Sequence, residues 1–269
     1  LGLKFDGQVL NDRFLIADVR MKAEFPSERW FWFDPPFHRG QSVLLHRQAD
    51  EVFRIDFQLG PNADPEQERK LERVTPRLKA MLGEREFDYE WVSVYSFTCR
   101  CMERFDHGRI FFAGDAAHVV SPFGARGGNS GVQDVDNLVW KLDLVLRGKA
   151  PARLLDTYSQ ERVPAAHENI RHSTRSTDFI TPKNEASRTL RDAVLSLAPR
   201  HAFARALINS GRLSQASRYG ANELATADGE NWSGGAMPGC PAPDAPWGNR
   251  WLFDGTDGGF RLLAFDVPI

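Results

Sequence analysis

The stretch GDAAHVVSPFGARGGNSGVQD combines an acidic side chain with a glycine-rich loop. Asp115 follows an apolar run at residues 110–113, and a helical pattern begins near Ser130. The glycines between and beside them are Gly124, Gly127, Gly128 and Gly131. Unpaired backbone N–H groups at a helix start attract an acceptor, and glycines allow close approach. The pattern predicts a carboxylate and several amides facing one ligand.

The spacing alone leaves three interpretations of this loop. A phosphate could bind there, although the sequence lacks both Gly-Lys-Ser/Thr and G-x-G-x-x-G. A flat heterocycle could place a carbonyl oxygen against the N–H groups, with Pro122 at its edge. The loop could also be a tight turn without a ligand. We expect the helix to begin at Ser130, because Ser130 and Gln133 have capping-box spacing and Asp134 would suit the first turn.

The elements that precede this loop are mostly predicted strands. Residues 13–60 alternate apolar and polar side chains and predict strands, and 64–82 predicts a helix that Pro76 bends or splits. Strand periodicity returns before Phe105, which indicates a mostly antiparallel sheet. The run Ile110–Ala113 is typical of a strand buried on both faces, beyond whose end ligands bind in open α/β sheets.

Helices follow the loop. One apolar helix face is expected, formed by Val132, Val135, Leu138, Val139, Leu142, Val145 and Leu146. A second helix is expected to be interrupted at Pro164, and further helices cover about 185–210. Residues 227–248 are rich in glycine and proline and read as a linker.

Composition limits the partners. A formal net charge of −2 provides no field that would attract nucleic acid or an anionic membrane. No run approaches the roughly 20 apolar residues of a membrane helix. The odd number of cysteines, Cys99, Cys101 and Cys240, indicates a reduced, cytoplasmic setting without a disulfide framework. Cys99 and Cys101 are expected to fill the core and not to bind a metal.

The segment from Gly108 to Leu142 resembles the second flavin motif of the single-component aromatic hydroxylases. These class A flavoprotein monooxygenases are typified by p-hydroxybenzoate hydroxylase and phenol hydroxylase. The following LLDTYSQERVPAAHEN resembles the family's next helix, residues 1–107 resemble its substrate sheet more loosely, and GCPAPDAP resembles the entry to its thioredoxin-like domain. The fold implied is α+β (α/β): a mostly antiparallel substrate-domain sheet, then the distal part of a Rossmann-like FAD-binding domain.

The resemblance implies a role for each loop residue. Asp115 would hydrogen-bond the ribityl hydroxyls of FAD, and Pro122 would lie at the reacting edge of the isoalloxazine. Backbone N–H groups of Gly128 and Asn129 would face the pyrimidine carbonyl. Gly124 and Gly127 complete the expected cofactor-binding set. Arg126 could add positive charge or be a solvated surface side chain, and His118 could orient the loop or serve structure alone.

The activity implied is that of an FAD-dependent aromatic-ring monooxygenase. NADH or NADPH would reduce FAD, and O2 would give a flavin C4a-hydroperoxide that hydroxylates a small phenolic substrate. The aromatic-rich sheet would exclude water from that intermediate. Tyr95, His38 and His46 are the candidates for deprotonating the phenol.

The expected domains are a substrate-binding sheet domain at 1–107, the distal FAD-binding part with a helical extension at 108–226, the linker at 227–248 and the start of a truncated thioredoxin-like domain at 249–269. The family's G-x-G-x-x-G unit and Asp–Gly motif are absent. We therefore expect this chain alone to bind FAD weakly or not at all and to be inactive. We also expect it to associate with a second copy or with a missing N-terminal segment.

Two alternatives stay open. The flavin fold could serve a reductase or epoxidase that acts on a nonaromatic substrate. The chain could also be a noncatalytic interaction module derived from the family.

Overall fold

The computed structural model describes residues 2–209, 214–220, 222–225, 237–255 and 259–263. The chain separates into two compact units, Leu1–Gln215 and Ala216–Ile269. The boundary predicted at residue 107 falls inside the first unit, and most of the predicted linker lies outside the described residues. The four-part division stays a prediction.

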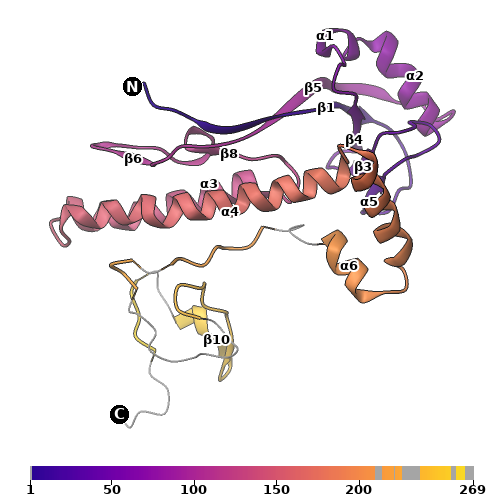
Figure 1. The fold of residues 1–269 in the computed structure, drawn as a ribbon. Helices are drawn as coiled ribbons and strands as arrows, with labels where there is room; N and C mark the ends of the chain where they lie inside the picture. Colours follow the sequence, from indigo (N-terminus) through magenta and orange to yellow (C-terminus); the bar gives the residue numbers. More distant parts are fainter. Residues whose placement is uncertain (1, 210–213, 221, 226–236, 256–258, 264–269) are drawn as a thin grey trace. The chain divides into compact units, whose positions relative to one another are not determined.

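The first unit contains a six-stranded sheet in the order β2-β3-β4-β1-β5-β8, and all neighbouring strands are antiparallel (Figure 1). The strands are β1 (Asp6–Arg20), β2 (Arg29–Trp32), β3 (Val43–Arg47), β4 (Val52–Leu59), β5 (Asp88–Cys101) and β8 (His118–Val119). The expected mostly antiparallel sheet is confirmed. The two longest strands, β1 and β5, lie side by side and extend toward β8, which links the sheet to the glycine-rich loop.

One face of the sheet carries an apolar core. Side chains alternate strictly along β4, so that Phe53, Ile55, Phe57 and Leu59 are buried and the residues between them are only partly buried. The helix pair α1 (Pro65–Glu68) and α2 (Leu71–Leu82) follows β4, and α2 buries Val74, Leu78 and Leu82 in the same core.

Of the two effects predicted for Pro76, the split of the helix is wrong, and the bend stays a prediction. The division between α1 and α2 falls at Arg69–Lys70, and α2 continues through Pro76. Proline in a helix removes one backbone hydrogen bond, and here the burial of Val74 and Leu78 on either side holds the helix together.

The second part of this unit is built on two long helices, α3 (Arg126–Leu146) and α4 (Asp156–Ile180), which lie side by side (Figure 1). They are antiparallel, because contacts early in α3 reach late positions of α4. The 3₁₀ turn η2 (Ala152–Leu155) joins them, and α5 (Glu185–Leu197) and α6 (Ala202–Asn209) follow. The expected interruption at Pro164 is wrong, since α4 runs through it with Arg162, Ala165 and Ala166 buried.

The apolar run before the loop differs from its prediction. Only Ile110–Phe111 forms a strand, β7, which pairs with β6 (Asp106–His107). Ile110 is exposed and Phe111 partly buried, so the strand is not buried on both faces. Within the described part no second strand pairs with β7.

The second unit has little regular structure among its described residues. A short antiparallel pair, β9 (Pro246–Trp247) and β10 (Arg250–Trp251), precedes the 3₁₀ turn η3 (Leu252–Gly255). The Arg250 guanidinium lies 4.8 Å from the centre of the Trp247 ring. Among the helices that the structure describes, none has the length and apolar character needed to cross a membrane.

Candidate functional site

The glycine-rich loop delivers the chain into α3 one turn earlier than expected. The helix begins at Arg126, after Gly124 and Ala125 in the left-handed region with φ values of +94° and +54°. Ser130 is therefore not the N-cap. It lies inside the helix and is fully buried, and its hydroxyl accepts a hydrogen bond from Asn169 Nδ2 at 2.7 Å.

The start of α3 is open. No side chain caps it, and the first four N–H groups of a helix have no partner within the helix. Pro122, Gly128 and Asn129 are exposed, and a Cβ placed on Gly128 would meet nothing within 4 Å. The helix start is thus uncapped and accessible beside Gly128, as an anion- or carbonyl-binding helix start requires.

Asp115 lies close to this helix start. It is exposed in the 3₁₀ turn η1 (Gly114–Ala116), and η1 packs against α3. The approach is tight because glycine faces glycine: a Cβ on Gly131 would lie 3.3 Å from Gly114 Cα. Since Gly131 lies little more than one turn inside α3, the backbone of η1 next to Asp115 lies near the start of the helix.

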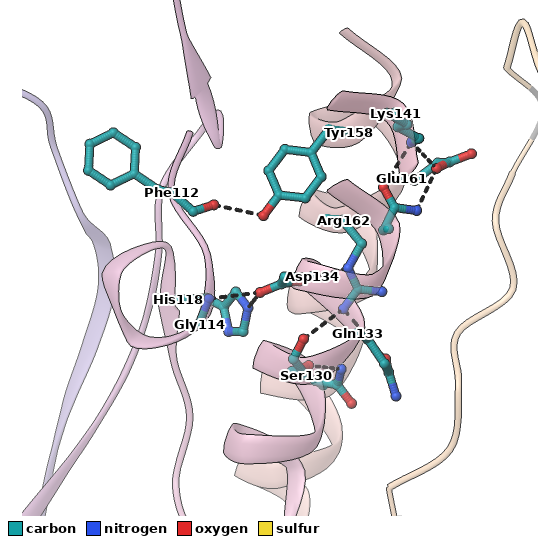
Figure 2. A network of polar contacts seen from close by, with 12 residues as sticks. Phe112, Gly114, His118, Ser130, Gln133, Asp134, Lys141, Tyr158, Glu161 and Arg162 are labelled. Atoms are coloured by element: carbon teal, nitrogen blue, oxygen red, sulfur yellow. Dashed lines mark hydrogen bonds and ion pairs between the residues drawn. The ribbon is translucent and has the colours of Figure 1, made fainter. Parts of the chain in front are cut away.

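Beneath this surface, Asp134 joins three elements (Figure 2). Its Oδ2 accepts from the Gly114 backbone N–H at 2.9 Å and lies 2.6 Å from His118 Nε2. Its Oδ1 accepts from Arg162 Nε of α4 at 2.7 Å. Asp134 is fully buried, so it does not serve the first turn of the helix as expected.

The charge state of Asp134 follows from these contacts. Burial alone would raise its pKa, but the hydrogen bond and charge of His118, the charge of Arg162 and the Gly114 N–H outweigh burial and hold the pKa below its ordinary value. The carboxylate therefore stays ionised, and it fixes Gly114 directly before Asp115.

A second part of the same interface holds Arg126. This side chain is buried, with Nη1 2.7 Å from Asn169 Oδ1, and burial lowers its pKa. The surface-arginine interpretation is therefore wrong. His118 is buried against Asp134, as expected for a histidine with a structural role.

Further along the two helices, Lys141 and Glu161 form a buried ion pair at 2.6 Å, with Asn137 bonded to both (Figure 2). Burial is the largest influence on Lys141 and lowers its pKa against the opposing effect of Glu161. Tyr158 Oη donates to the Phe112 carbonyl at 2.7 Å and so ties α4 to the segment before Asp115.

These residues were missed, although a signal for them exists in the sequence. The polar positions Ser130, Asp134, Asn137 and Lys141 recur at i, i+4, i+7 and i+11, which places them on one face of a helix. That face is the buried one. On the opposite side, Val132, Val135, Val139 and Leu146 are 50–81% exposed. Leu138 of the expected apolar face is buried, and Leu142 packs beside it. The expected face is therefore packed only in part, and association with a second copy or a missing segment stays a prediction.

The three candidate bases lie in different surroundings. His38 Nε2 is 2.7 Å from the Gln58 carbonyl oxygen, and its ring packs on Phe57 of the apolar core. His46 and Tyr95 lie on the opposite face of the sheet, where Tyr95 pairs with Phe14. Burial lowers the pKa of both histidines. Among the described residues, none of the three forms a hydrogen bond with the loop at 122–129, and their catalytic role stays a prediction.

The residues present fit the isoalloxazine and ribityl part of FAD. The exposed Asp115 carboxylate can accept hydrogen bonds from hydroxyls, and the uncapped amides of Gly128 and Asn129 can donate to a carbonyl oxygen. The open space beside Gly128 leaves room for a flat ring. Gly124 supplies the left-handed turn, and Gly127 packs against Val120.

Comparisons with known proteins identify the family of the chain. A family model described as FAD binding domain matches residues 1–173. The 3-(3-hydroxy-phenyl)propionate/3-hydroxycinnamic acid hydroxylase of Comamonas testosteroni is 30% identical over 196 residues, which cover 72% of this chain and 33% of that protein. The chain thus spans about a third of the length of the curated relatives it matches.

Solved structures show the same fold. The OxyS anhydrotetracycline hydroxylase from Streptomyces rimosus aligns with a TM-score of 0.58 and 29% identity, over 78% of this chain and 42% of that one. The flavin-dependent monooxygenase PieE, solved with FAD and substrate, aligns with a TM-score of 0.68 over 91% of this chain and 49% of that one. Its identity is 22%, so this likeness concerns the fold alone.

Proposed function

The chain belongs to the FAD binding domain family, and on that premise we propose that it forms the substrate sheet and distal flavin-binding part of a monooxygenase that hydroxylates a phenolic substrate. FAD reduced by NADH or NADPH would supply the activated form of O2. The protein would contribute binding, orientation and the exclusion of water.

The observation that carries this proposal is the open start of α3 beside Asp115. Asp115 would bind the ribityl hydroxyls, and the Gly128 and Asn129 amides would face the pyrimidine carbonyl. A helix start at that place stabilises negative charge on a reduced ring system. Pro122 would line the reacting edge. Because Asp134 holds Gly114 from below, the surface is formed before any ligand binds.

The test uses the protein expressed from the complete reading frame and loaded with FAD. With 3-(3-hydroxyphenyl)propionate as probe, we expect NADH- or NADPH-dependent incorporation of one oxygen atom from ¹⁸O2, detected by mass spectrometry. Asp115→Ala should release flavin on gel filtration, whereas Asp136→Ala, an exposed aspartate of α3, should retain it. Retention of flavin by Asp115→Ala, or reduction without oxygen incorporation into any phenol, would contradict the proposal.

We further propose that this chain alone holds only the isoalloxazine end of the cofactor. The 269 residues contain no G-x-G-x-x-G pattern for the pyrophosphate, whose contacts are worth several kcal/mol at the order of magnitude of nucleotide affinities. The chain should therefore bind FAD no more tightly than riboflavin and should turn nothing over. Fluorescence titration with both flavins measures this, and tight binding of FAD alone would overturn it.

A further inference from the structure

The sheet has a second face, opposite the α2 core, that carries polar side chains. The register places Arg54 opposite Asp18 and His46, and places Asp56 opposite Ile16 and Leu44. Ile16 in turn pairs with Ser93 of β5. Directly paired residues of antiparallel strands project to the same side, so these side chains form two adjacent rows on one face.

Three buried polar atoms on this face have no hydrogen-bond partner within the described part of the chain. They are Asp56 Oδ1, Ser93 Oγ and His46 Nδ1. Asp18 differs, because Arg54 binds both of its carboxylate oxygens, at 2.7 and 2.8 Å. Buried polar groups in native proteins are almost always hydrogen-bonded, so three unpaired polar atoms on one face indicate a place where a ligand could bind.

The ionised Asp56 carboxylate lowers the stability of the folded protein. Burial, the largest influence, and the Asp18 charge raise its pKa, Arg54 and Arg29 lower it, and the result is a pKa of about 6. Because the folded-state pKa lies above the unfolded value of 3.8, the penalty for ionising this carboxylate is complete above about pH 6. The penalty shrinks as pH falls and is gone only below the unfolded value. A side chain kept at such a cost is a candidate for function.

The surroundings of Asp56 suit an aromatic ring. Ile16 stands between Asp56 and Ser93, whose Cα atoms are about 10 Å apart across two strand spacings. In the next row Phe14 contacts Phe97 and also Phe123 of the glycine-rich loop, at 5.4 and 5.5 Å between ring centres. The polar face is thus continuous with the loop assigned to the flavin.

We propose that this face binds the hydroxyl-bearing end of an aromatic substrate, with the ring on Ile16, the hydroxyl donating to Asp56 and Ser93 Oγ hydrogen-bonding a second polar group. The proposal deepens the proposed function and rests on it for the identity of the ligand as a substrate. Asp56 then determines specificity: it selects rings that carry a hydrogen-bond donor over rings that do not.

Binding to the FAD-loaded protein from the complete reading frame tests this site. The probes are 3-(3-hydroxyphenyl)propionate and 3-phenylpropionate, which differ by one hydroxyl, in isothermal titration at pH 7.5. We expect the wild type to bind the hydroxylated probe about tenfold more tightly. Asp56→Asn should reduce this preference to about twofold or less, and Ser93→Ala should weaken both probes by a smaller factor.

The controls are Asp88→Asn and Ser96→Ala, since both residues are exposed on β5 and Ser96 projects to the other face. Neither should alter the preference. Asp56→Asn should also melt at the same or a higher temperature than the wild type at pH 7.5, with the difference shrinking below about pH 6 and vanishing only below about pH 4. A merely structural carboxylate would give a lower melting temperature.

Equal affinity of the wild type for both probes, no binding of either, or an unchanged preference in Asp56→Asn would overturn the proposal. These results are separable from those for the proposed function. Oxygen incorporation with an unchanged preference in Asp56→Asn refutes this site alone. Loss of the preference in a protein that incorporates no oxygen refutes the hydroxylase alone and leaves the site supported.

Discussion

The sheet core and the interface between α3 and α4 are held together by opposite means. The sheet packs Phe53, Ile55 and Phe57 against α2 with hydrocarbon alone. The two long helices instead bury Asp134 on Arg162 and Lys141 on Glu161, while α3 leaves valines exposed. Apolar packing tolerates small errors of position, whereas a buried ion pair requires every partner in place. The stricter interface lies directly under the candidate flavin site.

The largest expected effect concerns the centre of the polar interface. Asp134→Asn removes the charge that three buried donors share, so the free energy of unfolding should fall by about 3–5 kcal/mol. Urea denaturation followed by circular dichroism measures the change. Asp136→Asn, on the exposed side of α3, should leave the unfolding midpoint unchanged. A loss below about 1 kcal/mol for Asp134→Asn would show that the ion pair does not hold this interface.

The second prediction tests the apolar core of the sheet, for comparison with the polar interface. Leu78→Ala leaves a cavity between α2 and the sheet and should cost about 2–5 kcal/mol. Leu71→Ala, in the same helix but 51% exposed, should cost less than about 1 kcal/mol. The Leu78→Ala loss should be the same at 50 mM and 500 mM salt. A loss that depends on salt would mean that the two regions are less distinct than their contacts indicate.

The third prediction separates the two kinds of packing by a double-mutant cycle. Lys141→Met leaves Glu161 buried without its cation, and Glu161→Leu does the reverse, so each alone should be strongly destabilising. The double variant removes both charges and should recover about 1–3 kcal/mol of the summed losses. Strict additivity in urea denaturation would contradict the ion pair as the source of the effect.

The smallest effect is the pH dependence of the polar interface. The folded-state pKa of Asp134 is lowered, so its stabilisation is complete above the unfolded value of about 4 and is lost as pH falls through the folded value. The difference in unfolding free energy between wild type and Asp134→Asn should be constant from pH 5 to 8 and shrink below pH 4. A difference that grows on acidification would reverse the sign and refute the assignment.

The same contrast explains what the sequence could predict. Alternation along residues 52–59 identifies the core face of β4, because hydrophobic burial depends on local pattern alone. The position of Asp115 before an uncapped helix start also follows from the loop, whereas its role toward a cofactor stays a prediction. The partners of Asp134 and Lys141 lie 28 and 20 residues away, so no local rule connects them.

Two other features, the burial of Asp56 and the start of α3, could be recognised only from the three-dimensional structure. A polar residue between Ile55 and Phe57 is ordinary for a strand with one solvent-facing side. Only the structure shows that Asp56 Oδ1 is buried without a hydrogen-bond partner, on the same face as Ile16 and Ser93. The helix start was misplaced because Ser130 and Gln133 satisfy the local capping pattern. The buried hydrogen bond from Asn169 to Ser130 places that serine inside the helix instead.

The contact of Gly114 with Gly131 has a consequence for how the loop recognises a cofactor. Because neither residue has a side chain, the loop rests on the helix backbone itself, and Asp134 locks it there with one hydrogen bond. The chain therefore loses little conformational entropy when a ligand arrives at Asp115, so more of the contact energy is retained as affinity. An alanine at either glycine would push the loop away from the helix, and under the proposed function flavin would then dissociate faster although its contact residues were unchanged.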